Sequence, residues 1–147
     1  MKFLRKIAYY RFLYTKSKDE HLFPLMDNQV LIMTVAFNNI EFITLQISFL
    51  KKFFNEKFSH CILDNSTIPK VRNELKAVCL LNNISYIGVP TGHFNDHKSH
   101  GAAMHWGFVQ VVKKIKPSIF GYLDHDIFPF KSFKVSDKLH QGVYGRV

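Results

Sequence analysis

Asp124 and Asp126 are the two side chains whose type and spacing best fit a chemical role in this sequence. They follow residues 119–123, an apolar run with the length and composition of a β-strand. If that strand continued through them, both carboxylates would point to one face and His125 to the other. Two such carboxylates need a compensating charge, which a hard divalent cation supplies when it also binds phosphate oxygens. The Asp-x-Asp tripeptide alone is weak evidence for a metal site, because roughly one chain in three of this composition contains it by chance.

The elements that would position this pair alternate along the chain. Short apolar runs predict β-strands at residues 30–37, 60–63, 85–89 and 119–123. Amphipathic segments predict helices at residues 40–54, from Pro69 onward, and from about His100 to Lys116. This alternation predicts an α/β fold with a parallel sheet and right-handed crossovers. Such sheets bind ligands beyond the carboxyl ends of their strands, here residues 38–39, 64–67, 91–101 and 124–126.

Composition limits the class of protein. The chain has 147 residues, of which 47% are hydrophobic, as expected for one globular domain. Its 20 Lys and Arg residues outnumber 11 Asp and Glu residues, but six of the basic residues lie within residues 1–18, which contain no acid. The rest is nearly balanced, which argues against nucleic-acid binding. The sequence also lacks the glycine-rich phosphate loops and the serine elbow of common nucleotide-binding and hydrolase folds.

A basic amino-terminal arm, residues 1–20, precedes the domain at residues 21–147. Residues 3–14 interleave aromatic with basic side chains, as expected of a helix at an anionic membrane surface. The same composition fits a helix that packs its aromatics on the domain or on a partner. No stretch has the uninterrupted apolar length of a membrane span or a signal peptide. We therefore expect a cytoplasmic location, with peripheral contact with the inner face of the membrane as one interpretation of residues 1–18.

Four motifs resemble, in order and spacing, the landmarks of one enzyme family. They are VLIMTVAFNN at residues 30–39, ILDNS at 62–66, GAAMHWGF at 101–108 and YLDHD at 122–126. Together they resemble family 2 glycosyltransferases of the GT-A fold. The resemblance implies a Rossmann-like, mostly parallel sheet of strand order 3-2-1-4 with helices on both faces. It also implies a nucleotide-diphosphate-sugar donor, Mn²⁺ or Mg²⁺, and inverting transfer to a glycan or lipid-linked acceptor in surface polysaccharide or glycan biosynthesis.

The resemblance further implies roles for individual residues. The nucleotide-binding residues would be Thr34, Ala36, Asn38, Asp64, Gly101 and Asp124. Asp64 would accept a hydrogen bond from the base, although it could instead cap the helix that Pro69 opens. Asp124 would lie by the ribose and the metal-bound water, and Asp126 would bind the metal. In a sheet of the implied order, Asp64 and Asp124 would end the strands that flank the first strand and converge on one crevice.

The sequence departs from the family pattern in two respects. His97 and His105 stand where the family often has Asn. The catalytic base of the family is an acidic residue well downstream, whereas only Asp137 follows Asp126 here. We therefore expect the base and most of the acceptor site to lie outside this chain, with residues 141–146 beginning a further strand. The alternative function is a nucleotide-sugar-binding module or fragment that needs another segment for activity.

Histidines and a tryptophan in the third motif region have simpler interpretations. His93, His97, His100 and His105 lack the acidic or cysteine partners of a zinc site, apart from Asp96. Solvated histidines are the expected state, and contact of one of them with phosphate or sugar is the functional alternative. Trp106, within a predicted helix, is expected to belong to the core.

Overall fold

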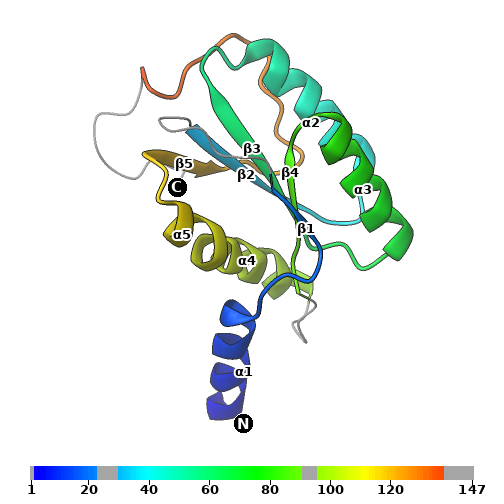
Figure 1. Ribbon diagram of the computed structural model, residues 1–147, viewed down its shortest axis with the longest axis vertical. Helices are drawn as coiled ribbons and strands as arrows, with labels where there is room; N and C mark the ends of the chain where they lie inside the picture. Colours follow the sequence, from blue (N-terminus) through cyan, green and yellow to red (C-terminus); the bar gives the residue numbers. More distant parts are fainter. Residues whose placement is uncertain (1, 23–29, 91–95, 138–147) are drawn as a thin grey trace.

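A five-stranded sheet forms the centre of the part of the molecule that the structure describes (Figure 1). A computed structural model describes residues 2–22, 30–90 and 96–137. The strands are β1 (Glu20–His21), β2 (Val30–Ala36), β3 (Phe58–Asp64), β4 (Ser85–Gly88) and β5 (Ile119–Tyr122). Their spatial order is β1-β4-β3-β2-β5. β2 pairs in parallel with both β3 and β5, β3 pairs in parallel with β4, and only the edge strand β1 is antiparallel.

The predicted α/β class with a mostly parallel sheet is confirmed, but the strand order differs from the predicted one by an added strand. The four predicted strands occupy the order expected of them, and β1 extends the sheet beyond the third. β1 pairs through two residues, Glu20 with Ile87 and His21 with Tyr86. A two-residue strand is too short to show the period-2 alternation by which strands are predicted, so its position depends on long-range pairing.

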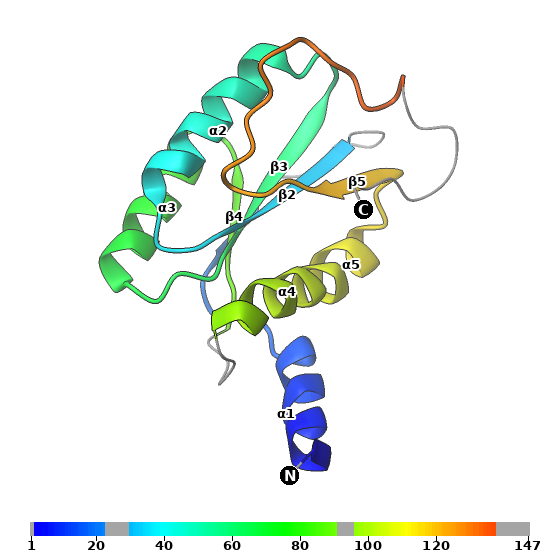
Figure 2. The ribbon, with the colours of Figure 1, turned by 180° about the vertical axis from the view of Figure 1, so that it is seen from behind.

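Helices cover both faces of the sheet, as predicted (Figure 2). α2 (Ile40–Phe53) and α3 (Pro69–Leu81) lie on one face. Their buried residues share a core with β3 and β4 that includes Ile43, Ile47, Ile62, Leu75, Cys79 and Tyr86. The opposite face carries α4 (Asp96–Gly107), a π-helical turn (Phe108–Val112) and α5 (Lys113–Ile115). Strand residues therefore alternate between two cores, with Met33 facing α4 and Ala36 facing α2 and α3.

The amino-terminal helix α1 (Lys2–Tyr14) packs part of its length against the α4 side. Phe12 and Leu13 are buried in that core. Nε1 of Trp106 donates to the carbonyl of Thr15 at 2.9 Å, and Nε2 of Gln110 donates to the carbonyl of Leu13 at 2.6 Å. Both bonds satisfy carbonyls at the carboxyl end of the helix, which have no partner within it. Trp106 is 1% exposed and belongs to the core, as predicted.

Two sequence-based expectations lie outside the described residues. The further strand expected at residues 141–146 is one, and the loop that carries His93 is the other. None of the described helices has the length and apolarity needed to cross a bilayer.

Candidate functional site

The acidic pair lies in a turn, which corrects the geometry expected if the strand continued through it. β5 ends at Tyr122, and the amide of Ile127 donates to the carbonyl of Asp124 at 3.0 Å, closing residues 124–127 into a turn. Both Asp124 and Asp126 are exposed, whereas the ring of His125 stacks against Phe42 of α2. The two carboxylates therefore face solvent from a turn beyond the carboxyl end of β5, beside β2.

A buried amide on α2 holds this turn. Nε2 of Gln46 donates to the carbonyl of Asp124 at 2.6 Å and to that of Ile127 at 3.0 Å. Gln46 is fully buried. Gln46 lies outside the four sequence motifs. It stands three residues after Ile43 and four before Leu50, which puts a polar side chain on the apolar stripe of the helix. A glutamine on a buried stripe usually has buried partners, and this is the signal that could have identified it.

Two further buried side chains fix the orientation of Gln46. The hydroxyl of Thr34 donates to Oε1 of Gln46 at 2.8 Å, and it lies 3.1 Å from Nε2 of His60. Since the single hydroxyl hydrogen goes to Gln46, Nε2 of His60 is the donor in the second bond. Burial lowers the pKa of His60 to about 4, so the ring is neutral at pH 7. A neutral chain of hydrogen bonds thus runs from β3 through β2 and α2 to the acidic turn.

This placement removes the side chain of Thr34 from the predicted nucleotide site. Thr34 is fully buried and its hydroxyl is taken by Gln46 and His60. Ala36, at the carboxyl end of β2, is also fully buried. The predicted contacts of both residues with a nucleotide therefore find no exposed side-chain atom. In the structure, Thr34 orients the buried amide of Gln46, and Ala36 packs in the core beneath α2.

The other side of the acidic turn faces α4. Nε2 of His100 lies 3.4 Å from Oδ1 of Asp124, and both side chains are partly exposed, at 41% and 57%. Gly101 follows on the same helix, and a Cβ built there would meet no atom within 4 Å. The structure therefore brings His100 into contact with the acidic turn, and Gly101, the next residue of α4, is exposed.

Of the other histidines in the third motif region, the structure describes the side chain of His105. The ring of His105 lies 2.8 Å through Nδ1 from the hydroxyl of Tyr9, so it links α4 to α1. The side chains of His93 and His97 are outside the part of the chain that the structure describes. Within the described part of this region, His100 is the histidine that lies beside the acidic turn, where phosphate or sugar contact was the functional alternative.

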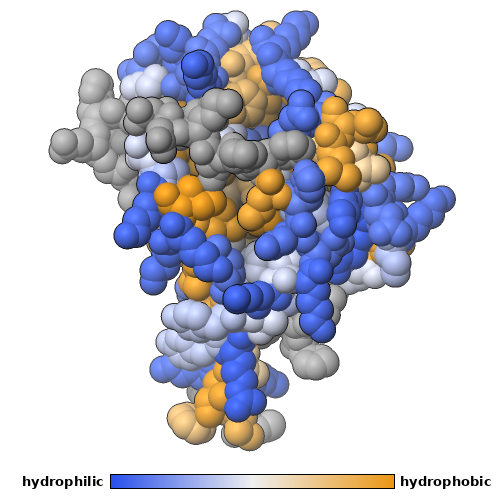
Figure 3. Space-filling model, viewed as in Figure 1, coloured by the Kyte–Doolittle hydropathy of each residue, from blue (hydrophilic) through white to orange (hydrophobic). Residues whose placement is uncertain are grey.

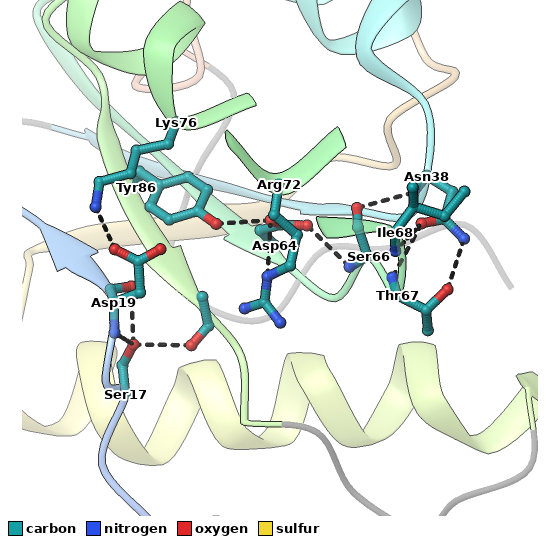
Figure 4. A network of polar contacts seen from close by, with 11 residues as sticks. Ser17, Asp19, Asn38, Asp64, Ser66, Thr67, Ile68, Arg72, Lys76 and Tyr86 are labelled. Carbon is teal, nitrogen blue, oxygen red and sulfur yellow. Dashed lines mark hydrogen bonds and ion pairs between the residues drawn. The ribbon is translucent and has the colours of Figure 1, made fainter. Parts of the chain in front are cut away.

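Asp64 occupies the centre of a second polar cluster, at the carboxyl end of β3 (Figure 4). Its carboxylate is fully buried. Oδ1 accepts from the amide of Ser66 at 2.8 Å, and Oδ2 accepts from the hydroxyl of Tyr86 at 2.7 Å and lies 3.5 Å from Nε of Arg72. Asp64 does not cap α3, which begins after Ile68 without a side-chain cap. Contact with a base would require a partner to move, and Arg72, whose side chain is 23% exposed, is the partner nearest to solvent.

Asn38 shapes the loop between β2 and α2 and joins it to the loop after β3. Its φ of 49° is left-handed, a conformation that Asn tolerates better than most residues. Its side-chain Oδ1 accepts from the backbone amides of Thr67 and Ile68 at 2.9 and 3.2 Å. The backbone amide of Asn38 donates to Oγ of Ser66 at 2.9 Å. These bonds lock the two loops together at the carboxyl edge of the sheet, where the nucleotide was predicted to bind.

The same cluster is fastened to the amino-terminal arm (Figure 4). Oγ of Ser17 donates to the carbonyl of Gly88 at 2.8 Å, and the amide of Gly88 donates to the carbonyl of Asp19 at 2.8 Å. The carboxylate of Asp19 pairs with Lys76 on α3. A Cβ at Gly88 would lie 2.5 Å from the guanidinium of Arg72, which is the end of a flexible side chain, and 3.2 Å from the carbonyl oxygen of Asp19, so glycine eases the close approach of the arm to β4.

The donor set at the acidic turn fits a cation that arrives with phosphates. Among the described residues, no group of three or more His, Cys, Asp or Glu side chains is arranged to hold a metal ion. Asp124 and Asp126 nevertheless offer exposed oxygen ligands, the type that Mg²⁺ and Mn²⁺ prefer. One or two carboxylates completed by substrate phosphates are the usual ligands of these ions in nucleotide sites. Asp124 and Asp126 are therefore the candidate ligands for a divalent cation that is shared with a diphosphate.

No protein-family model matches the chain, and no curated protein matches its sequence. The motifs and geometry of the chain itself are therefore the basis for assigning a function.

Proposed function

We propose that this chain is the donor-binding part of a metal-dependent, inverting glycosyltransferase of the GT-A fold. Its substrate would be a nucleotide-diphosphate sugar, and its acceptor a growing glycan or a lipid-linked sugar on the cytoplasmic side of the membrane. The observation that carries the proposal is the acidic turn. Two exposed carboxylates follow a strand next to β2, and a buried amide dedicated to that turn holds them there.

Each part of the carboxyl edge has a role in this proposal. Asp126 and Asp124 would bind a Mn²⁺ or Mg²⁺ ion, which would neutralise the diphosphate as it leaves the sugar. Gly101, which is exposed on α4 one residue after His100, would lie beside the donor. The locked loops at Asn38 would border the base, and Asp64 would meet it once Arg72 moves aside.

A binding module without catalysis is the second candidate, and the position of Asp137 favours it. After the acidic turn the chain runs back to the end of the sheet where the parallel strands begin. There Phe133 pairs with Phe54, just after α2. Glu56 then accepts hydrogen bonds from the amides of Val135 and Ser136, immediately before Asp137. Because β3 starts at Phe58, residues 54–56 lie at the amino ends of the strands. Asp137 is thus poorly placed as a base for chemistry at the carboxyl edge.

Calorimetric titration of the full chain with nucleotides tests the proposal. Uridine and guanosine nucleotides, each as mono- and diphosphate, are compared in the presence of Mn²⁺. At least one diphosphate should bind about tenfold or more tightly than its monophosphate, because the second phosphate completes the coordination of the metal. Equal affinity of mono- and diphosphates for both bases would contradict a metal-diphosphate site.

A second measurement separates the enzyme from the binding module. The chain is incubated with nucleotide-diphosphate sugars and Mn²⁺, and the released diphosphate is quantified. Lack of a base forgoes typically 10²–10⁴-fold of rate, so we expect binding with little release. Rapid release would show that a base lies within the chain, with Asp137 and His100 the first residues to replace.

A further inference from the structure

Helix α1 presents a second apolar face that the domain does not cover. Its inner face carries Phe12 and Leu13, which are buried at 9% and 2% exposure. Five large apolar or aromatic residues of the same helix are exposed, at 37% to 73%: Phe3, Leu4, Ile7, Tyr10 and Tyr14. α1 extends away from the domain, with its amino terminus at the far end (Figure 1). One apolar face of α1 packs on the domain, and the other apolar face remains uncovered and is available to contact a different surface.

The exposed residues form a stripe with basic residues on both sides. Phe3, Ile7, Tyr10 and Tyr14 are spaced at i, i+4, i+7 and i+11, the spacing of one helical face. At about 100° per residue, Lys6 lies about 70° to one side of the stripe centre and Arg11 about 70° to the other. Both of these side chains are exposed. Figure 3 shows hydrophobic and hydrophilic side chains next to each other on the projecting end of α1.

The charge of this segment selects an anionic partner. Residues 1–18 contain six basic residues, Lys2, Arg5, Lys6, Arg11, Lys16 and Lys18, and no acidic residue. A second copy of the chain would bring the same positive charges together, which disfavours self-association through this face. An amphipathic helix with aromatic residues on one face and Lys or Arg along its borders is suited to the interface of an anionic bilayer. Its 13 residues are too few to span the bilayer, so the helix would lie in the interface plane.

We propose that α1 binds the surface of an anionic phospholipid bilayer through this outer stripe. The inner face keeps the helix attached to the domain through Phe12, Leu13 and the hydrogen bonds from Trp106 and Gln110. Tyr9 adds a contact with His105 of α4. The domain would therefore be held next to the membrane by a docked helix, and this holds whether or not the chain binds a nucleotide sugar.

Sedimentation with vesicles tests the proposal on the full chain. Vesicles of phosphatidylcholine alone are compared with vesicles containing phosphatidylglycerol, at low and at high salt. The chain should bind only the anionic vesicles, and binding should fall steeply as salt rises, because salt screens the attraction between the basic side chains and the anionic headgroups. Absence of binding to anionic vesicles at low salt would overturn the proposal.

Two sets of variants assign the binding to the stripe. Phe3→Ser with Ile7→Ser and Tyr10→Ser should reduce binding about tenfold or more, since each removes apolar area that would enter the interface. As a matched control, Leu81→Ser with Phe130→Ser removes residues that are 84% and 76% exposed elsewhere, and binding should not change. These positions are exposed, so the fold should be retained, which circular dichroism checks. Equal losses in both sets would overturn the proposal, as would a concentration-dependent dimer that only the stripe variant loses.

Discussion

Acid should destabilise the domain through His60. Its ring is buried against Thr34 with no acidic neighbour in the hydrogen-bond chain, and burial lowers its pKa to about 4 from an ordinary value of 6.5. Between these two values the unfolded chain binds a proton that the folded chain does not bind. The contribution of the neutral ring is therefore complete above pH 6.5 and is lost as the pH falls toward 4.

The expected loss follows from the two pKa values. Between pH 8 and pH 5 the free energy of unfolding should fall by about 2 kcal/mol from this residue alone. Below pH 4, where the folded form also binds the proton, the total loss should level off at about 3 kcal/mol. His60→Gln keeps a hydrogen-bond donor but does not titrate, so it should lack this pH dependence whatever its absolute stability. The exposed His105 provides a matched control, because His105→Gln should keep the full dependence.

Urea unfolding at pH 8, 6 and 5 measures the effect. The single tryptophan, Trp106, is 1% exposed, so its fluorescence reports the loss of the core. The relevant quantity is the difference in slope of unfolding free energy against pH between the wild type and each variant. If His60→Gln loses as much stability as the wild type between pH 8 and pH 5, the ring is not buried in its neutral form and the reasoning is wrong.

Three other perturbations have outcomes set by the same geometry. Gln46→Met should cost about 1–3 kcal/mol, since two hydrogen bonds to the acidic turn are lost, and hydrogen exchange at the amide of Ile127 should become faster. Asp64→Asn should lower stability to urea by about 1–3 kcal/mol even without nucleotide, because it removes the partner of Arg72. Cys61 and Cys79 are buried and burial raises the pKa of each thiol to about 12, so mass spectrometry should detect alkylation only after unfolding.

The parts of the fold that could be predicted from sequence are those fixed by local pattern. β2 is buried on both faces and so reads as a nearly continuous apolar run, whereas β3 begins at Phe58, two residues before the predicted strand, because Ser59 and His60 interrupt the apolar pattern. α2 starts at its predicted residue because Asn39 caps it, its Oδ1 accepting from the amide of Phe42. The edge strand β1 could not be predicted, because its two residues are fixed by pairing with β4 and not by their own sequence.

The candidate site was predictable in its location but not in its contacts. Asp64 ends β3, and Asp124 follows the end of β5 by two residues, so the two lie at the carboxyl ends of the strands on either side of β2. Their surroundings come from residues far away in sequence. Arg72 and Tyr86 enclose Asp64, and Gln46 turns the chain at Asp124, so one carboxylate is buried and the other exposed. No motif spacing contains that information, because it depends on tertiary packing.

The metal dependence of diphosphate binding tests the central claim most directly. Calorimetry of the full chain with uridine and guanosine diphosphates is carried out with Mn²⁺ and with EDTA, for the wild type, Asp126→Ala and the control Asp137→Ala. We predict that Mn²⁺ strengthens binding of at least one diphosphate about tenfold or more, that Asp126→Ala removes this gain, and that Asp137→Ala keeps it. Equal affinity of the wild type with Mn²⁺ and with EDTA, or an unchanged gain in Asp126→Ala, would contradict a metal-diphosphate site at the acidic turn.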